Sequence, residues 1–274
     1  MSKKLKTISH IERTEIMKTA IITGATAGLG REYISVLAEK ANVEEIWLVA
    51  RRKERMDELA KEFSDKKKIV SVALDLTADN AVSEFKKILE EKKPDVTYLV
   101  NNAGCGKLGE LYGADPDSQT VMVDLNCRAM TALTCLVLPY MNAGAGVINV
   151  CSIASFAPNP NMTVYCSTKA YVMSFSRSLR FELKKRKINV LAVCPGPMRT
   201  EFLSIAGIEK GSSKTFDTLP YCDPKKVAIG SVKKSDKRKA VYTPRLFFKF
   251  YRVLAKLLPH SIVMRVWMSQ QKLK

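Results

Sequence analysis

The stretch that decides the fold is "TGATAGLG", residues 23–30. It follows a short apolar run, "TAIIT" (19–23), and opens a segment with the periodicity of an amphipathic helix. Gly24 allows the chain to turn sharply, and Gly28 and Gly30 allow backbone amides to approach an anion at the helix N-terminus. A glycine-rich turn between a strand and a helix predicts a site for the pyrophosphate of a dinucleotide.

The rest of the chain repeats this alternation of a short apolar run and a longer amphipathic stretch. Further strand candidates are 45–50, 69–74, 97–101, 146–150, 188–194 and 239–243, and helix candidates are 28–41, 52–63, 79–92, 118–141, 163–186 and 224–234. Continuous apolar strands separated by helices predict a parallel sheet that is covered on both faces. No linker rich in Pro, Gly or Ser interrupts the pattern. We therefore expect one α/β domain over residues 17–243, a Rossmann-type doubly wound parallel sheet of about seven strands.

Composition and the first residues exclude several protein classes. Hydrophobic residues make up 46% of the 274 residues, which is enough for a large core. We find no continuous apolar run of the length that predicts a transmembrane helix. Residues 1–16 are polar and lack the apolar segment of a secretory signal. Since Met17 reads as a natural start, we expect residues 1–16 to be a disordered N-terminal arm or to reflect an upstream initiation codon.

The cysteines and histidines predict no metal site. The seven cysteines are scattered singly without a C-x-x-C pair, and the two histidines are His10 and His260. This distribution favours neither zinc nor a disulfide framework, and it is typical of a cytoplasmic protein in a reducing compartment. Two histidines also leave little scope for a Ser-His-Asp triad.

The positive charge is concentrated at the C-terminus. The chain carries a formal net charge of +18, of which residues 233–274 contribute +11 through twelve Lys or Arg and one Asp. Residues 1–18 contribute +3 and the large remainder only +4. We expect residues 244–274 to form a basic amphipathic helical tail, with a cationic stripe at i, i+4, i+7 and i+11. The stripe consists of Arg245, Lys249, Arg252 and Lys256.

Three interpretations of this tail remain open at the level of sequence. The tail packs on the domain or on a neighbouring subunit and leaves a solvated basic face, or it makes peripheral contact with a membrane, as basic amphipathic helices do. A third interpretation is a gate for anionic lipophilic substrates. Binding of nucleic acid is not expected, because the basic stretch carries no recognition motif.

The spacing Gly-x-x-x-Gly-x-Gly of residues 24–30 resembles that of the short-chain dehydrogenase/reductase family. Other stretches fit this family in the same order along the chain: "NNAG" (101–104), Ser152, "YCSTK" (165–169) and "PGPMRT" (195–200). The resemblance covers residues 19 to about 245, and the extended tail resembles that of hydroxysteroid dehydrogenase-like members. It implies an oxidoreductase that interconverts a ketone and a secondary alcohol, in a homodimer or homotetramer.

Tyr165 and Lys169 are spaced to share one face of a helix, because side chains at i and i+4 stack on the same side. An ammonium beside a phenol favours the phenolate, so we expect Lys169 to lower the pKa of Tyr165 from its usual value of about 10. Lys169 is also placed to hold the nicotinamide ribose. Ser152 is expected to bond the substrate oxygen. The resemblance implies that Asn126 is the fourth catalytic residue, which anchors a water that links Lys169 to solvent.

The end of the second strand predicts the cofactor. A carboxylate there would accept hydrogen bonds from the adenosine ribose and repel a 2′-phosphate. The sequence instead reads "VARRKER" (49–55), with no acid before Glu54. Arg51 and Arg52 offer planar guanidinium groups suited to a phosphate, so we expect NADP(H).

The resemblance implies further cofactor contacts around the sheet. Asp75 and Leu76 would flank the adenine, Thr200 would bond the nicotinamide carboxamide, and Asn101 and Gly104 would shape the backbone beside the adenosine ribose. The complete predicted set, besides Arg51, Arg52, Tyr165 and Lys169, is Thr23, Gly24, Thr26, Gly28, Leu29, Gly30, Asp75, Leu76, Asn102, Ala103, Gly104, Pro195, Gly196, Met198 and Thr200.

The segments that we expect to line the substrate pocket are apolar. They include Cys105, Ile153, Ala154, Phe156 and Ala157, and a lid over residues 201–221 with Phe202, Leu203, Phe216, Leu219 and Tyr221. These residues favour a bulky hydrophobic ketone or alcohol, with hydroxysteroids or bile acids as the preferred class. A 3-oxoacyl reductase acting on acyl carrier protein or coenzyme A thioesters is the enzymatic alternative. A catalytically silent NADP(H)-binding sensor or scaffold is the alternative of another class, although a pure binder has no need of Ser152 and Tyr165.

Overall fold

The computed structural model describes residues 17–208, 211 and 214–269. The predicted arm, residues 1–16, and the last part of the tail, residues 270–274, lie outside the described residues. The strands are β1 Lys18–Thr23, β2 Glu45–Ala50, β3 Lys68–Ala73, β4 Asp95–Asn101, β5 Gly146–Val150, β6 Asn189–Val193 and β7 Val241–Tyr242. The helices of the domain are α1 Gly28–Ala38, α2 Lys53–Glu62, α3 Ala81–Lys92, α4 Pro116–Val123, α5 Met130–Val137, α6 Thr163–Glu182, α7 Glu201–Ile205, α8 Lys214–Thr218 and α9 Pro224–Asp236.

Within the described residues, seven strands form one parallel sheet in the order β3-β2-β1-β4-β5-β6-β7. Because β1 lies between β2 and β4, the winding reverses at β1, and the carboxyl ends of β1 and β4 meet at this switch point. Ligands of open α/β sheets bind in the crevice at such a point. The prediction of a doubly wound parallel sheet with a C-terminal helical extension is confirmed.

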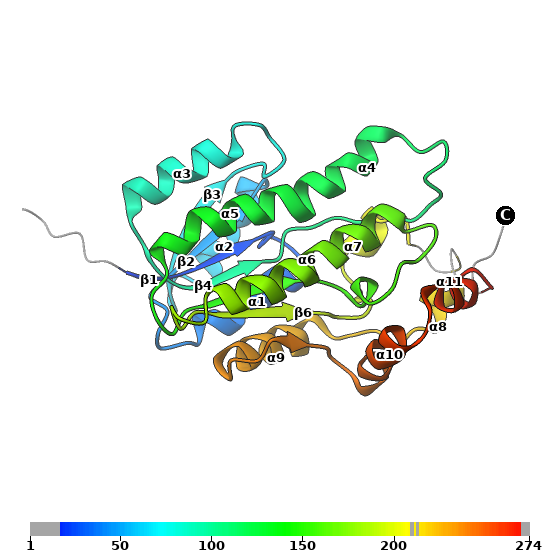
Figure 1. Cartoon of the computed structure of the whole chain (residues 1–274). Coiled ribbons are helices and arrows are strands. Elements are labelled where there is room, and N and C mark those ends of the chain that lie inside the picture. Colours follow the sequence, from blue (N-terminus) through cyan, green and yellow to red (C-terminus); the bar gives the residue numbers. More distant parts are fainter. Residues whose placement is uncertain (1–16, 209–210, 212–213, 270–274) are drawn as a thin grey trace, which may run out of the picture.

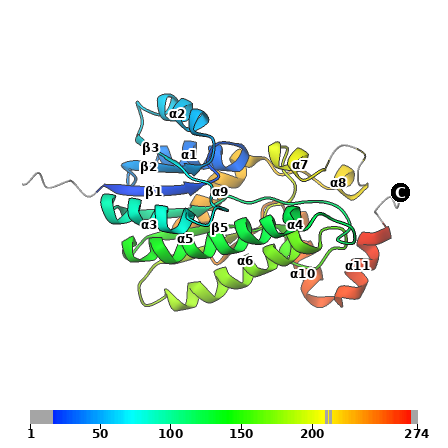
Figure 2. The same ribbon diagram turned by 90° about the horizontal axis from the view of Figure 1, so that it is seen from above.

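Two layers of helices cover the sheet. Helices α1, α2 and α9 pack on one face, and α3, α5 and α6 pack on the other (Figures 1 and 2). Successive side chains of a strand point to opposite faces of the sheet. Ile22 and Leu48 therefore join the core under the first layer of helices, and Ile21 and Val49 join the core under the second. Both faces are apolar, which explains why the strands read as continuous hydrophobic runs in the sequence.

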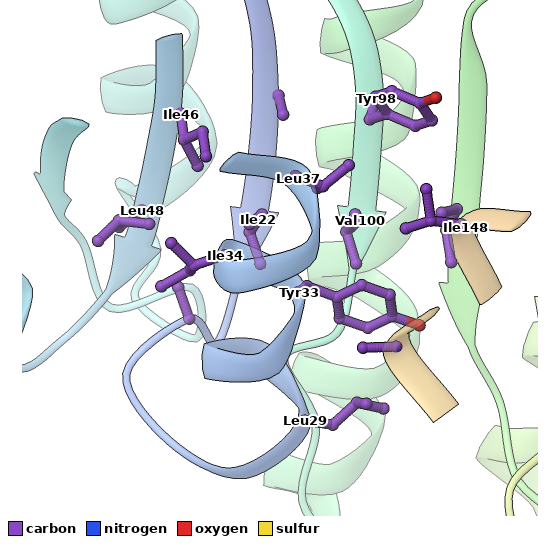
Figure 3. Close-up of a cluster of buried hydrophobic side chains, with 14 of the residues drawn as sticks. Ile22, Leu29, Tyr33, Ile34, Leu37, Ile46, Leu48, Tyr98, Val100 and Ile148 are labelled. Carbon is purple, nitrogen blue, oxygen red and sulfur yellow. The ribbon is translucent and has the colours of Figure 1, made fainter. Parts of the chain in front are cut away.

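Helix α1 shows how this packing fixes the glycine-rich turn. Its residues Leu29, Tyr33, Ile34 and Leu37 point onto the strands in the cluster drawn in Figure 3, and all four are buried. They repeat at helical spacing, which places one apolar face on the sheet. The start of α1 is thereby held next to the ends of the strands, where the candidate site lies.

The segment Pro116–Tyr140 is one continuous helical stretch of 25 residues, built from α4, a π-helical turn (η1, Asp124–Ala129), α5 and a short 3₁₀ turn. By length and composition alone it is apolar enough to cross a membrane. However, Leu133 and Val137 of α5 are fully buried in the core formed with the sheet and α3. We therefore interpret this stretch as a core helix of the domain.

Two helices follow β7: α10 (Leu246–Leu257) and α11 (His260–Ser269). They lie at the same end of the molecule as α4, α7 and α8 (Figures 1 and 2). Phe248 of α10 is completely buried, and its ring packs on Gly196 in the loop after β6, so closely that a Cβ at Gly196 would collide with the ring. The beginning of the predicted tail is therefore an integral part of the fold.

Candidate active site

The glycine-rich turn is fitted to the end of β4. Gly24 has a left-handed backbone (φ +64°), and a Cβ there would lie 2.8 Å from the Cα of Ala103. A Cβ on Gly30 would collide with the carbonyl oxygen of Gly24. Asn102 Nδ2 donates to the carbonyl oxygens of Thr23 (3.1 Å) and Gly24 (3.0 Å), which ties the two segments together. Only glycines fit this tight turn at Gly24 and Gly30. The first turn of α1 that follows it contains no acidic residue, so the helix N-terminus is free to bind an anion.

The end of β2 carries the two predicted arginines. Arg52 donates to Thr26 Oγ1 (3.1 Å from Nη2) and forms an ion pair with Glu201 of α7 (3.1 Å from Nη1). Arg51 lies 4.0 Å from Asp75, and its side chain is 76% exposed. Ion pairs between such exposed groups are weak, so they leave both guanidinium groups available to a phosphate. The donors at this point fit the 2′-phosphate of NADP(H).

Asp75, the second residue after β3, is held by hydrogen bonds from Thr77 rather than by the arginines. Thr77 donates to Asp75 Oδ1 through its hydroxyl (2.7 Å) and its backbone N–H (2.9 Å). These hydrogen bonds are the main reason why the pKa of Asp75 lies below its ordinary value. The carboxylate therefore stays ionised at neutral pH and keeps its position beside Leu76, where the adenine is expected.

Three of the four residues predicted for catalysis come together from helix α6 and the segment that follows β5. Tyr165 and Lys169 lie on α6, and Lys169 Nζ is 5.8 Å from the centroid of the Tyr165 ring. Ser152 is the second residue after β5, and its side chain lies close enough to Tyr165 to affect the pKa of the phenol. Lys169 Nζ donates to the carbonyl oxygen of Val150 (3.0 Å), the last residue of β5. Both Tyr165 and Lys169 are buried, so the pair is not a solvated surface feature.

Burial dominates the acid–base properties of this pair. It raises the pKa of Tyr165 well above its ordinary value, and the nearby Ser152 hydroxyl opposes this shift only in part. Burial also lowers the pKa of Lys169. The net direction of the shift is thus opposite to the one expected from the neighbouring ammonium, because desolvation by burial is its largest cause. The effect of Lys169 itself stays a prediction. A phenol that keeps its proton is suited to donating it to a developing alkoxide.

Asn126 is buried in the π-helical turn η1, a kind of turn that often marks functional sites. Its Nδ2 donates to the carbonyl oxygen of Cys105 (2.9 Å) and to Thr168 Oγ1 (3.0 Å), and its Oδ1 accepts from the N–H of Cys105 (3.0 Å). The side chain thus ties the loop after β4 to α6. Thr168 and Cys105 are partners that the sequence did not predict. The water-anchoring role of Asn126 stays a prediction.

The loop after β6 closes the end of the site where the nicotinamide is expected. Gly28 also has a left-handed backbone, and a Cβ there would lie 3.0 Å from the Cβ of Thr200, so this loop meets the glycine-rich turn. Met198 pairs with Cys222 in an isolated β-bridge, which fixes the loop from its other side. The contact between Phe248 and Gly196 was not foreseen, because one Phe in an apolar tail gives no sign of its partner.

One continuous cavity of about 860 Å³ connects these groups. The predicted residues that line it are Gly24, Thr26, Gly28, Leu29, Arg51, Arg52, Asp75, Leu76, Asn102, Ala103, Gly104, Ser152, Tyr165, Lys169, Pro195, Gly196, Met198 and Thr200. Thr23, Gly30 and Asn126 lie behind this lining and support it. Asn101 is also buried behind it, where its Nδ2 donates to Thr134 Oγ1 (2.9 Å) and Asn149 Oδ1 (2.8 Å).

The residues that line the substrate half of the cavity match the predicted set only in part. Cys105, Ile153, Ala154, Phe202, Leu203, Phe216 and Leu219 line it as predicted. Three predicted residues do not. Phe156 packs on Tyr251, with ring centroids 6.0 Å apart, Ala157 is buried, and Tyr221 lies under Arg199. The wall that the sequence did not reveal comes from α10 and α11, through residues such as Tyr251, Leu254, Val263 and Trp267.

A dinucleotide cradle at the switch point, beside a buried Tyr–Lys pair and a serine, defines a class of nicotinamide-dependent oxidoreductases. The model of the short chain dehydrogenase family matches residues 18–207. The chain belongs to this family, and it is an oxidoreductase acting on alcohols or ketones.

Two curated relatives show the range of the family around this chain. The NADP-dependent 3-hydroxy acid dehydrogenase of Schizosaccharomyces pombe is 35% identical over 195 residues, which are 68% of this chain and 73% of the relative. The very-long-chain 3-oxoacyl-CoA reductase-A of Danio rerio is 34% identical over 196 residues, which are 69% of this chain and 60% of the relative.

Two solved structures share the fold closely. A short-chain dehydrogenase from Sphingobium yanoikuyae in complex with NADPH aligns with a TM-score of 0.75 and 29% identity, over 84% of this chain and 89% of the other. The bulky-bulky ketone specific alcohol dehydrogenase from Comamonas testosteroni aligns with a TM-score of 0.71 and 28% identity, over 88% and 94%.

Arg52→Ala is expected to weaken NADPH binding by about ten- to a hundredfold, since a charge-assisted hydrogen bond contributes about 1.5–3 kcal/mol. Arg51→Ala should act in the same direction. The affinity for NADH should barely change, because NADH lacks the 2′-phosphate. Dissociation constants for both cofactors, measured by fluorescence titration, check this prediction.

Arg55→Ala is the matched control for this experiment. Arg55 pairs with the same Glu201 as Arg52 (2.7 Å) but does not line the cavity. Its loss should leave the preference between NADPH and NADH intact. Equal losses for NADPH and NADH in Arg52→Ala would show that this side chain does not recognise the 2′-phosphate.

Proposed function

We propose that this protein uses NADP(H) to interconvert a bulky hydrophobic ketone and its secondary alcohol, with hydroxysteroids or bile acids as the preferred substrates. The observation that carries the proposal is the cavity beyond Tyr165. Its walls are apolar and come from several elements, with Phe202 on α7, Phe216 on α8, Tyr251 on α10 and Trp267 on α11. Such a lining buries a large apolar substrate and offers few groups to a small polar one.

The aromatic residues of this wall hold one another in place. The rings of Tyr165 and Phe202 lie 5.8 Å apart, and those of Phe216 and Trp267 lie 6.1 Å apart at an interplanar angle of 89°. Trp267 Nε1 also donates to the carbonyl oxygen of Pro160 (2.8 Å). The cavity is thus shaped by packed rings from distant segments, which suits a rigid polycyclic substrate. The bulky-ketone dehydrogenase of similar fold supports a substrate of this size.

Side chains of the protein carry out the proton transfer that accompanies hydride transfer. The cofactor is NADP(H), which supplies or accepts the hydride when it is bound. The Tyr165 hydroxyl gives its proton to the oxygen that becomes an alkoxide, and Ser152 donates a hydrogen bond to the same oxygen. Lys169 places a positive charge beneath the phenol, which stabilises the phenolate left behind. The buried surroundings exclude water from this exchange.

A second candidate is the reduction of a 3-oxoacyl thioester. It is favoured by the 34% identity to the very-long-chain 3-oxoacyl-CoA reductase-A. It is also favoured by the cations of α10, Lys249, Arg252 and Lys256, which lie on a helix that lines the cavity. The anionic phosphates of coenzyme A or of a carrier protein would meet these cations at the surface.

A substrate panel tests the proposal directly. Oxidation of NADPH is followed with steroid and bile-acid ketones, 3-oxoacyl-CoA thioesters, and short ketones such as acetone. We expect kcat/KM for the preferred bulky ketone to exceed that for acetone by at least about a hundredfold, since each buried CH₂ contributes about 0.8 kcal/mol. Faster turnover of the thioesters than of every steroid ketone would favour the second candidate. Equal kcat/KM for short and bulky ketones would contradict both.

A further inference from the structure

Helix α10 has two apolar faces, and one of them is left exposed. Phe248 and Ala255 are buried against the domain. On another side of the helix lie four exposed apolar residues at i, i+4, i+7 and i+11: Leu246 (80% exposed), Phe250 (65%), Val253 (55%) and Leu257 (73%). This spacing forms a single row along the helix. The interpretation in which the tail packs on the domain thus holds for one face of α10 only.

The cationic stripe runs beside this exposed row. Within the helix, Lys249, Arg252 and Lys256 each precede one residue of the exposed row, so the two rows run side by side along α10. Arg245 lies just before the helix, where it donates to the carbonyl oxygen of Tyr221. Helix α11 continues the pattern with exposed Ile262 and Val266 next to Arg265. Residues 237–269 contain no Asp or Glu. An exposed apolar row flanked by cations is the arrangement of a helix that lies in the interface of a membrane.

We propose that the exposed face of α10 and α11 docks on the surface of an anionic lipid bilayer. The apolar row, Leu246, Phe250, Val253 and Leu257, enters the boundary between headgroups and acyl chains. The cations beside it contact lipid phosphates, whose charge is complementary. The two helices lie together at one end of the molecule, so they can meet a flat surface without the sheet intervening (Figures 1 and 2).

A second copy of the chain is less complementary in charge to this face than an anionic bilayer is. In a symmetric dimer the same patch is present on both partners. Two copies meeting through α10 would therefore bring two cationic stripes together, with no carboxylate on either helix to compensate. The charge pattern thus selects an anionic partner over self-association.

The docking face also borders the cavity. Phe247, Leu258, Ile262 and Val266 are exposed and at the same time line it. If the proposed function is correct, docking places this edge of the cavity at the bilayer, where hydrophobic ketones accumulate. This consequence rests on the proposed function, whereas the docking itself does not. Vesicle binding is therefore measured without substrate, so that failure of one claim is distinguishable from failure of the other.

The test is co-sedimentation of the full-length protein with vesicles of phosphatidylcholine alone or mixed with phosphatidylglycerol. We expect binding to the mixed vesicles, with much weaker binding to phosphatidylcholine alone and at high salt. Lys249→Gln with Lys256→Gln should lower the partition coefficient about thirtyfold, at roughly fivefold for each charge. Phe250→Ser with Leu257→Ser should lower it at least about tenfold, because two apolar side chains no longer leave water.

Matched controls come from exposed positions elsewhere. Lys184→Gln with Lys185→Gln removes two exposed cations after α6, and Phe181→Ser removes a ring that is 78% exposed. Both should bind vesicles like the unmodified protein. NADPH affinity and the thermal unfolding midpoint verify that every variant is folded, since neither Phe250 nor Leu257 lines the cavity.

Three results would overturn the proposal. The first is no binding to anionic vesicles by the unmodified protein. The second is equal binding of the α10 variants and the controls. The third is a drop in molar mass by light scattering for Phe250→Ser with Leu257→Ser, which would show that this face is an interface between copies of the chain.

Discussion

Tyr165→Phe is expected to lower kcat for ketone reduction by about a hundred- to ten-thousandfold, the range over which a positioned general acid acts. The substitution removes the hydroxyl that donates the proton and leaves the ring in its place against Phe202. The dissociation constant for NADPH should change by no more than about twofold, because the variant keeps Lys169, the glycine-rich turn and both arginines. Steady-state kinetics and fluorescence titration on the same preparation check both halves of this prediction.

The matched control is Tyr171→Phe, on the same helix. Tyr171 is 42% exposed, and its hydroxyl lies 2.7 Å from Thr131 Oγ1, away from the cavity. Its loss should leave kcat within about twofold of the unmodified enzyme, as for most surface substitutions. If Tyr165→Phe retained a tenth of the original activity, Tyr165 would not be the proton donor.

Lys169→Met is expected to harm both chemistry and cofactor binding. The substitution keeps most of the side-chain volume but removes the buried ammonium that donates to the carbonyl oxygen of Val150. We expect kcat to fall at least about a hundredfold, because the variant loses the positive charge that stabilises the Tyr165 phenolate and the N–H donor that Lys169 holds in place. The affinity for NADPH should fall about tenfold if Lys169 also holds the nicotinamide ribose.

The two variants distinguish the roles of their residues. Tyr165→Phe changes kcat without changing NADPH affinity, whereas Lys169→Met changes both. Lys184→Met, at an exposed lysine just after α6, controls for the loss of a cation on that part of the chain. An unchanged NADPH affinity in Lys169→Met would assign the lysine to proton chemistry alone.

The parts of the site that the sequence predicted depend on short segments. The glycine-rich turn, the arginines after β2 and the Tyr165–Lys169 pair are each set within one strand–turn–helix unit or one helix. Their geometry follows from local rules such as the i, i+4 spacing and the need for glycine at φ values near +60°. The doubly wound class of the sheet could also be predicted from the alternation of strands and helices, whereas the order of its strands was not.

The parts that the sequence did not predict depend on contacts between distant segments. The Phe248 ring packs on Gly196, and Trp267 Nε1 donates a hydrogen bond to the carbonyl oxygen of Pro160. These partners are far apart in the sequence, so no helix or strand periodicity predicts their contacts. Phe156 lies beside the expected pocket in the chain, yet its ring packs on Tyr251 instead. The direction of the pKa shift of Tyr165 also depends on burial by the complete fold, whereas the neighbouring cation was visible in the sequence.

Transfer of deuterium tests most directly whether this enzyme reduces bulky hydrophobic ketones with NADPH. The enzyme is incubated with a steroid ketone and with NADPH that carries deuterium at the transferable position of its nicotinamide. Mass spectrometry and NMR then locate the label in the product. We predict a secondary alcohol with one deuterium at the former carbonyl carbon, formed at similar rates by the unmodified enzyme and by Tyr171→Phe and at least about a hundredfold more slowly by Tyr165→Phe. If the protein binds NADPH tightly but forms no labelled alcohol from any ketone, it is not an NADPH-dependent ketone reductase, and the central claim is contradicted.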